Sequence, residues 1–317
     1  MTSPLKKYVF GPVRSRRLGR SLGVDLVTAK TCTFDCVYCE AGRTTDLTLD
    51  RRAYVPTEAV IAEIASVLST DIPLDVVTFS GAGEPTLHAE IGDVISAIHA
   101  LRPDLRVVVL TNGSLMGSAQ VRRSLMNADQ VKISVDAIGP DAVARINRPH
   151  PDLDWEQALE GIRLFCGTFG GDVSMEVFIV PGINDTQDEL KKIADYLKPL
   201  QIAEVQINTL DRPGVESWVH QLDARRLEEI RAFLGDLAGI IGAPVNTVAS
   251  RGPVCLSGLT SADVLEMIRR RPCTAEDISK TTGVSEGRVK QVLGALVAAS
   301  VAQCEKQVRG TFYFTRC

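Results

Sequence analysis

The run CTFDCVYC, from Cys32 to Cys39, places three cysteines on one short stretch with the spacing C-x3-C-x2-C. The next cysteine, Cys166, is far along the chain. Thiolates are strong ligands for soft metals such as iron, and a closed iron–sulfur cluster normally takes four of them. Three close ligands without a fourth therefore predict a cluster with one open iron, and an open position is typical of catalytic rather than structural metal centres.

Two other interpretations of these cysteines stay open. They could form a zinc knuckle, or they could be three unrelated buried thiols. A structural zinc site also takes four ligands, and the nearest histidine is His88. The spacing alone thus favours the open cluster without excluding the alternatives.

Around this run the chain alternates between two patterns. Short apolar, β-branched runs predict strands at 22–27, 76–80, 107–111, 131–135, 177–180 and 205–208. Helical spacing predicts helices at 57–68 with Thr57 as cap, 154–165, 185–197 with Asp185 as cap, and 223–237. Alternating strands and helices indicate right-handed βαβ units and a parallel sheet. Six such units are too few for a complete eightfold barrel.

Polar motifs follow the predicted strands where they end. In chain order these are the cysteine run, GAGEP (81–85), TNG (111–113), SVDA (134–137), PGIND (181–185) and Asn208. Ligands bind at the carboxyl ends of parallel strands. The motifs therefore predict one site at a single edge of the sheet.

The chain resembles the radical S-adenosylmethionine (SAM) superfamily over residues 8 to 215. The resemblance rests on the cysteine spacing and on FSGAGEPTLH, LTNG, KISVDA and EVFIVPGIND. GPVRSRRLGRSLGVDL (11–26) and INRP (146–149) resemble one subgroup, the iron–sulfur oxidoreductases similar to the synthase of the tricyclic wyosine base in tRNA. The resemblance implies an α/β fold with a partial (β/α)6 TIM-like barrel. Its implied cofactors are a [4Fe–4S] cluster on Cys32, Cys36 and Cys39 and SAM, with an external one-electron reductant such as flavodoxin or ferredoxin.

In this family the open iron takes the amino and carboxylate groups of SAM, and one electron cleaves SAM to methionine and a 5′-deoxyadenosyl radical that takes a hydrogen atom from the substrate. The resemblance implies SAM contacts from Tyr38, Gly81, Gly83, Glu84, Asn112, Lys132, Ser134, Asp136 and Val180. Glycine lets a ligand approach the backbone closely, although Ala82 interrupts the two adjacent glycines common in the family. The carboxylate of Glu84 suits the SAM ammonium group. Loop packing by Tyr38, and a satisfied buried polar network at Ser134 and Asp136, are the alternatives.

Arginine is the preferred partner of phosphates and carboxylates. We expect an anionic substrate or the SAM carboxylate to contact some of Arg14, Arg16, Arg17, Arg148, Asn208 and Arg212. Surface or structural ion pairs are the alternative for the arginines.

The C-terminal part has a separate pattern. ASRGPVCLSG (249–258) reads as a linker, and helical runs at 261–271, 274–283 and 284–300 precede two strand-like runs in 301–314. Thr274 and Ser285 are natural N-caps, and Gly283 suits the turn between helices. Three helices followed by a hairpin predict a winged helix-turn-helix. The predicted domains are thus 1–250, the barrel, and 258–317, the winged helix-turn-helix domain.

Composition sets outer limits on the function. The chain of 317 residues is 45% hydrophobic and 23% charged, with a net charge of −4, so the whole protein is not an electrostatic nucleic-acid binder. Residues 258–317 carry a net charge of +3 against −7 for the rest. We find neither a signal peptide nor a membrane-spanning run, and the eight cysteines look like ligands and reduced thiols. A cytoplasmic protein without a membrane partner is expected.

A second cluster is not favoured, because Cys255, Cys273, Cys304 and Cys317 are scattered. Wyosine synthases are thought to need an added N-terminal cysteine set, and no cysteine precedes Cys32. The missing set is a departure from the family pattern that puts the exact wyosine reaction in doubt.

Three functions remain in competition. The first is a radical SAM enzyme acting on an RNA base, with Arg288, Lys290 and Gln291 of the third C-terminal helix contacting a backbone. The second is a radical SAM activase or maturase whose substrate is a protein or peptide. The third is an iron–sulfur redox-sensing transcription regulator, which would not need GAGEP, SVDA or INRP.

Overall fold

The structure, a computed structural model, describes residues 7–15, 18–70, 72–241, 259–307 and 309–315. Its main sheet has eight strands in the spatial order β1 (Val9–Ser15), β2 (Gly19–Val24), β5 (Val76–Phe79), β6 (Arg106–Thr111), β7 (Gln130–Ser134), β8 (Asp172–Phe178), β9 (Glu204–Asn208) and β10 (Ala238–Ile240). Every neighbouring pair is parallel except β1 and β2. The edge strands β1 and β10 do not pair with each other, so the sheet is a partial barrel.

The six predicted strands are confirmed as β2 and β5 to β9. Two strands of the main sheet, β1 and β10, were not predicted. β1 contains a Gly-Pro step and arginines, and β10 has three residues, too few for a periodic signal.

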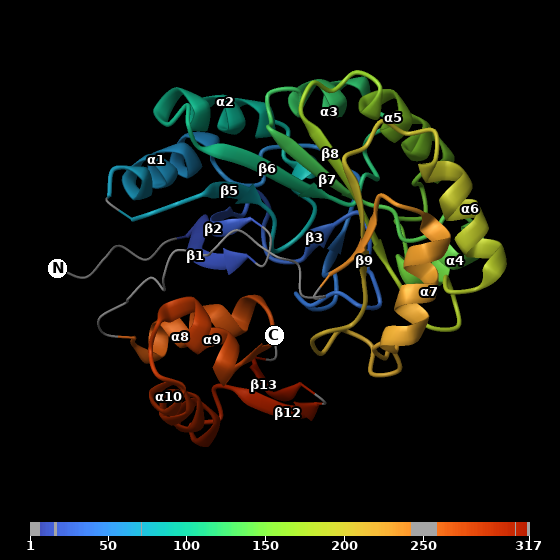
Figure 1. Cartoon of the computed structure of the whole chain (residues 1–317). Coiled ribbons are helices and arrows are strands. Elements are labelled where there is room, and N and C mark those ends of the chain that lie inside the picture. The colour runs from blue at the N-terminus through green and yellow to red at the C-terminus, as the bar shows by residue number, and fades with distance from the viewer. Residues whose placement is uncertain (1–6, 16–17, 71, 242–258, 308, 316–317) are drawn as a thin grey trace.

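Helices cover the outer face of the curved sheet (Figure 1). They are α1 (Thr57–Leu68), α2 (Ile91–Leu101), α3 (Ala119–Ser124), α4 (Pro140–Ile146), α5 (Trp155–Cys166), α6 (Gln187–Leu197) and α7 (Ala224–Leu234). Shorter elements are β3 (Thr31–Cys32), β4 (Asp46–Leu47) and the 3-10 helix η1 (Pro85–Leu87).

Helix termini differ from the predictions at three places. Thr57 is the first helical residue of α1, and Pro56 precedes it as N-cap without a side-chain bond. Thr186, not Asp185, caps α6, because Asp185 instead accepts a hydrogen bond from Gly182 N. The helix predicted to reach residue 237 ends at Leu234, where Gly235 takes a φ of +97°.

The two faces of the sheet differ in polarity. Apolar side chains such as Val77, Val109 and Ile133 are fully buried under the helices. Strand alternation puts polar side chains on the other face. Gln130 Nε2 donates to Ser174 Oγ at 2.9 Å, and Lys132 Nζ donates to Gln206 Oε1 at 2.5 Å. The barrel interior is therefore lined with hydrogen-bonding groups.

The C-terminal part, which we call the C-terminal module, has its own core. Its elements are α8 (Ser261–Arg270), β11 (Cys273–Thr274), α9 (Ala275–Thr282), α10 (Glu286–Ala298), β12 (Gln303–Gln307) and β13 (Gly310–Phe314). Val264, Ile268, Ile278, Val289 and Leu293 pack together there. Thr274 and Ser285 cap α9 and α10, and Gly283 is left-handed at a φ of 74°, as predicted. The assignment as a winged helix-turn-helix stays a prediction, and the predicted linker 249–258 lies outside the described residues.

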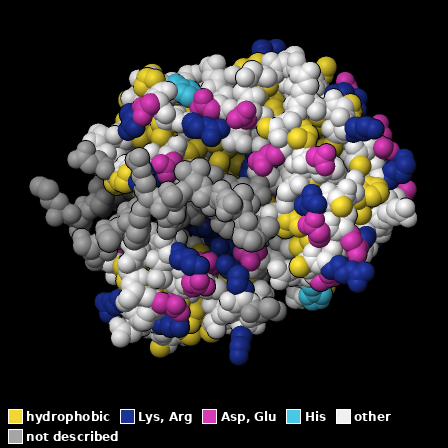
Figure 2. Space-filling view, in the orientation of Figure 1, with side chains coloured by type: hydrophobic (Ala, Val, Ile, Leu, Met, Phe, Trp, Pro, Cys, Tyr) yellow, Lys and Arg dark blue, Asp and Glu magenta, His cyan; other side chains and the backbone are white. Residues whose placement is uncertain are grey.

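Ion pairs join the C-terminal module to loops at the carboxyl ends of the strands. Arg212, after β9, donates to Pro272 O at 2.7 Å and to Asp277 at 2.8 Å. Arg270 of α8 pairs with Asp25, which follows β2. Charged side chains of both signs lie along the boundary between the module and the sheet (Figure 2). In the part of the chain that is described, no helix has the length and apolarity to cross a membrane.

Candidate metal and cofactor site

The cysteine loop and the GAGEP turn are joined backbone to backbone. Lys30 N donates to Ala82 O at 2.7 Å, and Glu84 N donates to Thr31 O at 3.1 Å. A Cβ on Gly83 would lie 1.7 Å from Thr31 O, and one on Gly81, whose φ is +117°, would lie 2.1 Å from Asp25 Oδ1. Both glycines are therefore required by contacts between loops, a reason different from the ligand approach expected from the sequence.

Each of the three cysteine sulfurs has a side-chain nitrogen donor. Lys30 Nζ lies 3.2 Å from Cys39 Sγ. Asn147 Nδ2, just past α4, lies 3.5 Å from Cys36 Sγ, and Asn112 Nδ2, just past β6, lies 3.6 Å from Cys32 Sγ. Hydrogen bonds to ligand sulfurs orient the ligands and tune the potential of an iron–sulfur cluster. Three donors from three segments thus fit thiolates that carry an anionic cluster.

Burial opposes ionisation of these thiols in the absence of metal. It raises the pKa of Cys32 to about 12, with the charge of Glu84 adding to the effect. It also raises the pKa of Cys36 well above its usual value, and the charges of Asp136 and of the other two cysteines contribute. A bound metal ion deprotonates a coordinating thiol outright, so metal binding here is coupled to release of protons.

Within the described residues, no three His, Cys, Asp or Glu side chains converge on a point where one metal ion could sit. A four-iron cluster binds each thiolate through a different iron, so its ligands need not converge on one point. The donor set of three thiolates matches such a cluster with one open iron.

Glu84 is deeply buried, and protein donors take up most of its carboxylate. Oε1 accepts from Thr86 N at 3.0 Å, Thr86 Oγ1 at 2.5 Å and Thr111 Oγ1 at 2.7 Å, and Oε2 accepts from Asn112 N at 2.8 Å. Burial raises the pKa of Glu84, while these donors oppose the rise. Glu84 therefore ties the GAGEP turn to the end of β6, and its predicted contact with the SAM ammonium stays a prediction that rests on the remaining lone pair.

Asp136 is the centre of a second buried network. Its carboxylate accepts from Tyr38 Oη at 2.5 Å, Asn147 Nδ2 at 2.7 Å and Phe178 N at 2.9 Å. The Tyr38 ring stacks on Phe178 with centroids 3.8 Å apart. Burial raises the pKa of Asp136, and the three donors counteract it. This network fixes the cysteine loop over the ends of β7 and β8.

The remaining predicted SAM contacts surround the same edge. Ser134 ends β7 and is half-buried, and Lys132 points along the barrel interior to Gln206. Val180 is fully buried, and its N–H donates to Asn184 Oδ1 at 2.7 Å. Together with Asn112, these residues bring the third, fourth and fifth motifs to one place.

The predicted substrate residues are spread more widely. Arg148, with a φ of 45°, pairs with Glu216 at 2.7 Å and with Asp35 at 3.9 Å. Asn208 Oδ1 accepts from Thr209 N at 3.0 Å. Arg212 is buried and engaged by the C-terminal module, so its predicted role as a substrate ligand would require that ion pair to open. Arg14 is described only by its backbone pairing with Arg20, and Arg16 and Arg17 lie outside the described residues.

Sequence reasoning missed three residues that shape the site. Lys30 faces a sulfur from a left-handed backbone with a φ of 61°, and no sequence pattern predicts that conformation at a lysine. Asn147 links Cys36 to Asp136, and Asn184 donates to Asp136 O and Phe178 O. The two asparagines belong to the INRP and PGIND motifs, and an asparagine at a strand or helix end is the signal that could have identified them.

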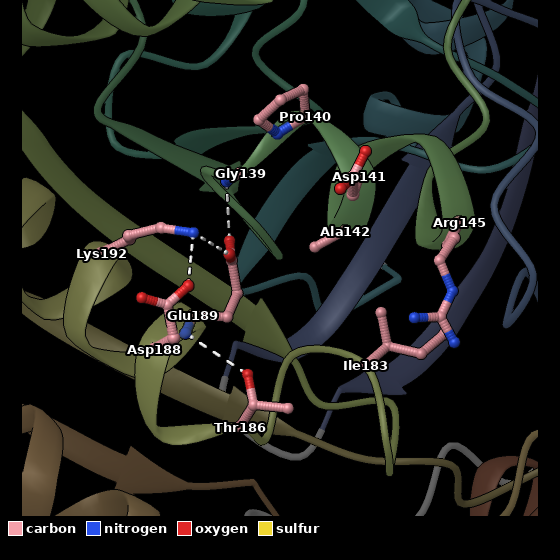
Figure 3. A pocket seen from close by; sticks show the side chains of 10 residues that line it. All are labelled: Gly139, Pro140, Asp141, Ala142, Arg145, Ile183, Thr186, Asp188, Glu189 and Lys192. Carbon is pink, nitrogen blue, oxygen red and sulfur yellow. Dashed lines mark hydrogen bonds and ion pairs between the residues drawn. The ribbon is translucent and has the colours of Figure 1, made fainter.

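Two cavities lie next to α4. The larger, about 440 Å³, is lined by Arg145, Arg148, Ile183 and Trp218. The smaller, about 190 Å³, shares Arg145 and Ile183 and is shown in Figure 3. Its polar groups are partnered: Glu189 Oε1 accepts from Ile138 N and Gly139 N at 2.6 and 2.8 Å, and Lys192 pairs with Asp188 at 2.6 Å. The larger cavity is the better candidate for a ligand, because Trp218 is 45% exposed beside it.

Comparison with known proteins identifies the relatives of this chain. A UPF0026 protein of Helicobacter pylori (strain J99) is 34% identical over 85% of this chain and 86% of its own length. A longer protein of Brachyspira hyodysenteriae, named GTPase Obg, is 30% identical over 97% of this chain, which spans only 45% of that relative.

Solved structures show the same fold. A radical SAM methyltransferase from Sphaerobacter thermophilus superposes with a TM-score of 0.54 at 18% identity, covering 69% of this chain and 65% of the other. TYW1 with a lysine-pyruvate adduct bound gives a TM-score of 0.51 at 15% identity over 68% and 72%.

The profile of the Radical SAM superfamily matches residues 26–197, just over half of the chain. The predicted family, partial barrel and enzyme class are thereby confirmed, as are SAM and a [4Fe–4S] cluster as the cofactors of the family. The chain belongs to the Radical SAM superfamily.

Proposed function

We propose that Cys32, Cys36 and Cys39 hold the [4Fe–4S] cluster and that the enzyme uses SAM to abstract a hydrogen atom from an RNA base. When bound, the cluster and SAM supply the 5′-deoxyadenosyl radical, with the electron coming from a reductant such as flavodoxin or ferredoxin in the cytoplasm. The observation that carries the proposal is that all three cysteines, each with a nitrogen donor at its sulfur, lie at the edge that also gathers GAGEP, TNG and SVDA.

The chain's own residues supply geometry and exclusion of water. The network of Asp136, Tyr38 and Asn147 holds the cysteine loop in place. Glu84 holds the GAGEP turn against β6. The hydrogen-bonding side chains of the barrel interior, including Lys132, are suited to the polar groups of SAM.

The larger cavity supports the choice of an RNA base. Asn147 contacts Cys36, and the adjacent Arg148 lines this cavity, so the cavity adjoins the cysteine loop. Splayed RNA bases stack on aromatic rings and guanidinium planes, and Trp218 with Arg145 and Arg148 offers both. On α10, Arg288, Lys290 and Gln291 are exposed and could contact a backbone, although Lys290 also pairs with Glu286 at 2.7 Å.

Cofactor assignment is tested by variants of the cysteines. After anaerobic reconstitution the native protein should contain about four irons and four sulfides per chain. Replacing Cys32, Cys36 or Cys39 by Ala should abolish this iron and sulfide content. Cys166→Ala is the matched control, because Cys166 is buried in the main core away from the loop, and it should keep the cluster. Stoichiometric zinc without iron in the native protein would contradict the assignment.

Substrate assignment is tested by anaerobic turnover with cell fractions. RNA should raise 5′-deoxyadenosine above the background without substrate, and Arg145→Gln with Trp218→Phe should reduce that increase about tenfold while leaving the background unchanged. Stimulation by peptide or protein alone would instead favour the activase or maturase. Absence of SAM binding would favour the redox-sensing regulator.

A further inference from the structure

Lys30 is a nearly buried cation whose ammonium faces a cysteine sulfur. The residue is 8% exposed, and Nζ lies 3.2 Å from Cys39 Sγ. Across the described residues, no carboxylate lies within ion-pair distance of Nζ, and this sulfur is its only hydrogen-bond partner. A buried charge is costly unless an opposite charge compensates it. A negative charge at Cys39 would therefore compensate the buried charge of Lys30.

The backbone holds Lys30 in this orientation. Its N–H donates to Ala82 O in the GAGEP turn, and its carbonyl accepts from Thr45 N at 3.0 Å and Asp46 N at 3.1 Å. These bonds leave the residue in the left-handed region at a φ of 61°. The backbone is thus fixed from both sides, which fixes the point from which the side chain of Lys30 reaches Cys39 Sγ.

Lys30 differs in charge from the donors at the other two sulfurs. Asn112 and Asn147 donate through neutral amides at 3.6 and 3.5 Å, and each also bonds an oxygen, Thr33 Oγ1 or Asp136 Oδ2. Their loss would disturb those oxygens as well. Of the three donors, Lys30 is thus the one whose side chain can be replaced with least effect on the rest of the hydrogen-bond network.

We propose that Lys30 sets the reduction potential of the cluster by stabilising its reduced form. This inference rests on the proposed placement of the cluster on Cys32, Cys36 and Cys39. One electron passes from the external reductant to the cluster, no covalent bond changes, and the assembly becomes more negative by one charge. A fixed positive charge at Cys39 Sγ is attracted more strongly to the reduced form than to the oxidised form, so it raises the potential. Lys30 acts through the thiolate of Cys39 and is a positioning and tuning residue.

The test is a potentiometric titration of the full-length, anaerobically reconstituted protein, followed by the electron paramagnetic resonance signal of the reduced cluster. Lys30→Met removes the charge and keeps the length, Lys30→Gln keeps a neutral donor, and Lys30→Arg keeps the charge. Lys191→Met is the control, because Lys191 is an exposed lysine on α6 paired with Asp195. The three backbone hydrogen bonds of residue 30 do not involve its side chain, so each variant at this position should keep them.

We expect Lys30→Met and Lys30→Gln to lower the reduced-to-oxidised ratio at a fixed potential about tenfold, a shift of about 59 mV for one electron. Lys30→Arg should retain most of the native potential, and Lys191→Met all of it. If Lys30→Met fails to hold iron, the comparison of Lys30→Gln with Lys30→Arg decides between charge and hydrogen bond.

Several outcomes would overturn the inference. A native potential in Lys30→Met, or in Lys30→Gln alone, would show that the charge does not tune the cluster. Weakened SAM binding with an unchanged potential would assign Lys30 to SAM instead. Absence of any cluster in the native protein would refute the proposed function itself, which is distinguishable because it precedes every comparison between variants.

Discussion

At the level of single residues, the cysteine loop and the GAGEP turn pack so closely that no side chain fits between them at Gly83. Thr31 O accepts from Glu84 N and would also meet any Cβ on Gly83. The clash would be with backbone that carries the first cysteine ligand, and backbone cannot turn aside as a flexible side chain can. Gly83 therefore connects the packing of the loops to the integrity of the cluster.

Gly83→Ala should destabilise the protein by about 3 kcal/mol or more, as severe overpacking does, and should lower the iron content after reconstitution. Gly170→Ala is the matched control, because the space around Gly170 is open, and it should change stability by less than about 0.5 kcal/mol. Chemical denaturation and iron analysis measure both. Native stability and iron content in Gly83→Ala would show that the two loops do not touch as described.

Individual site residues were predictable where their chemistry requires a recognisable spacing in the sequence. Thiolate spacing identified Cys32, Cys36 and Cys39 because few functions place three thiols so close in sequence. Lys30 and Asp25 left no such pattern, because their roles depend on a left-handed turn and on an arginine 245 residues away. The sequence identified Glu84 as a site residue. It could not show that Glu84 is buried and that its carboxylate accepts hydrogen bonds from four protein donors.

At the level of elements, the C-terminal module contacts the loops that follow β2 and β9. Arg212, on the loop after β9, inserts between α9 and the module's Pro272 and also lies 3.6 Å from Glu40, the residue after the last cysteine ligand. Arg270 lies over the Phe10 ring at 3.9 Å and pairs with Asp25, whose other oxygen accepts from Ala82 N. Both arginines thus link the module to the cofactor loops.

Arg212→Met should destabilise docking of the module by about 1–3 kcal/mol, because it removes one of the two guanidinium partners of Asp277 and leaves the buried carbonyl of Pro272 without its donor. Arg225→Met is the control, since Arg225 is 90% exposed and pairs only along its own helix. Calorimetry of the full chain should show an earlier unfolding transition in Arg212→Met alone. Equal effects of the two substitutions would mean that the contact of Arg212 with the C-terminal module contributes nothing.

Strands and helices were predictable to different degrees. β5 and β6 were found because buried parallel strands are largely apolar along their length, whereas β7 was found from Val131 and Ile133, which alternate with polar residues. The three errors at helix termini occurred where the capping group was a neighbour of the expected one or where a glycine stopped the helix. Docking of the module was not predictable, because Arg212 and Asp277 are separated by 65 residues and no periodicity relates them.

At the level of the whole molecule, the C-terminal module carries a net positive charge and the rest of the chain a net negative one. At the contact between them the signs are opposite, because Asp277 of the module pairs with Arg212 of the rest of the chain. Burial alone would raise the pKa of Asp277, but the charge of Arg212, the Thr274 N–H and Arg309 together lower it to about 2. Arg309 binds this carboxylate through two nitrogens at 3.0 and 2.8 Å. Asp277 is thus ionised throughout the neutral range and held by guanidinium groups from both parts of the chain.

The stabilisation from Asp277 should depend on pH in one direction. A folded-state pKa of about 2 lies below the ordinary value of 3.8, so the contribution is complete above 3.8 and is lost as the pH falls through about 2. At pH 7, Asp277→Asn should be less stable than the native protein by about 1–2 kcal/mol after allowance for screening by solvent. The difference between the two proteins should shrink between about pH 4 and pH 2, and a difference that grew on acidification would contradict the ion-pair account.

The central claim is that the three cysteines hold a cluster whose open iron receives SAM at this edge of the sheet. The most direct measurement is the electron paramagnetic resonance spectrum of the reduced, reconstituted protein with and without SAM. The account predicts a [4Fe–4S] signal that changes when SAM is added, persists in Cys166→Ala and is lost in Cys36→Ala. A cluster signal that SAM leaves unchanged, or one that survives loss of Cys36, would contradict it.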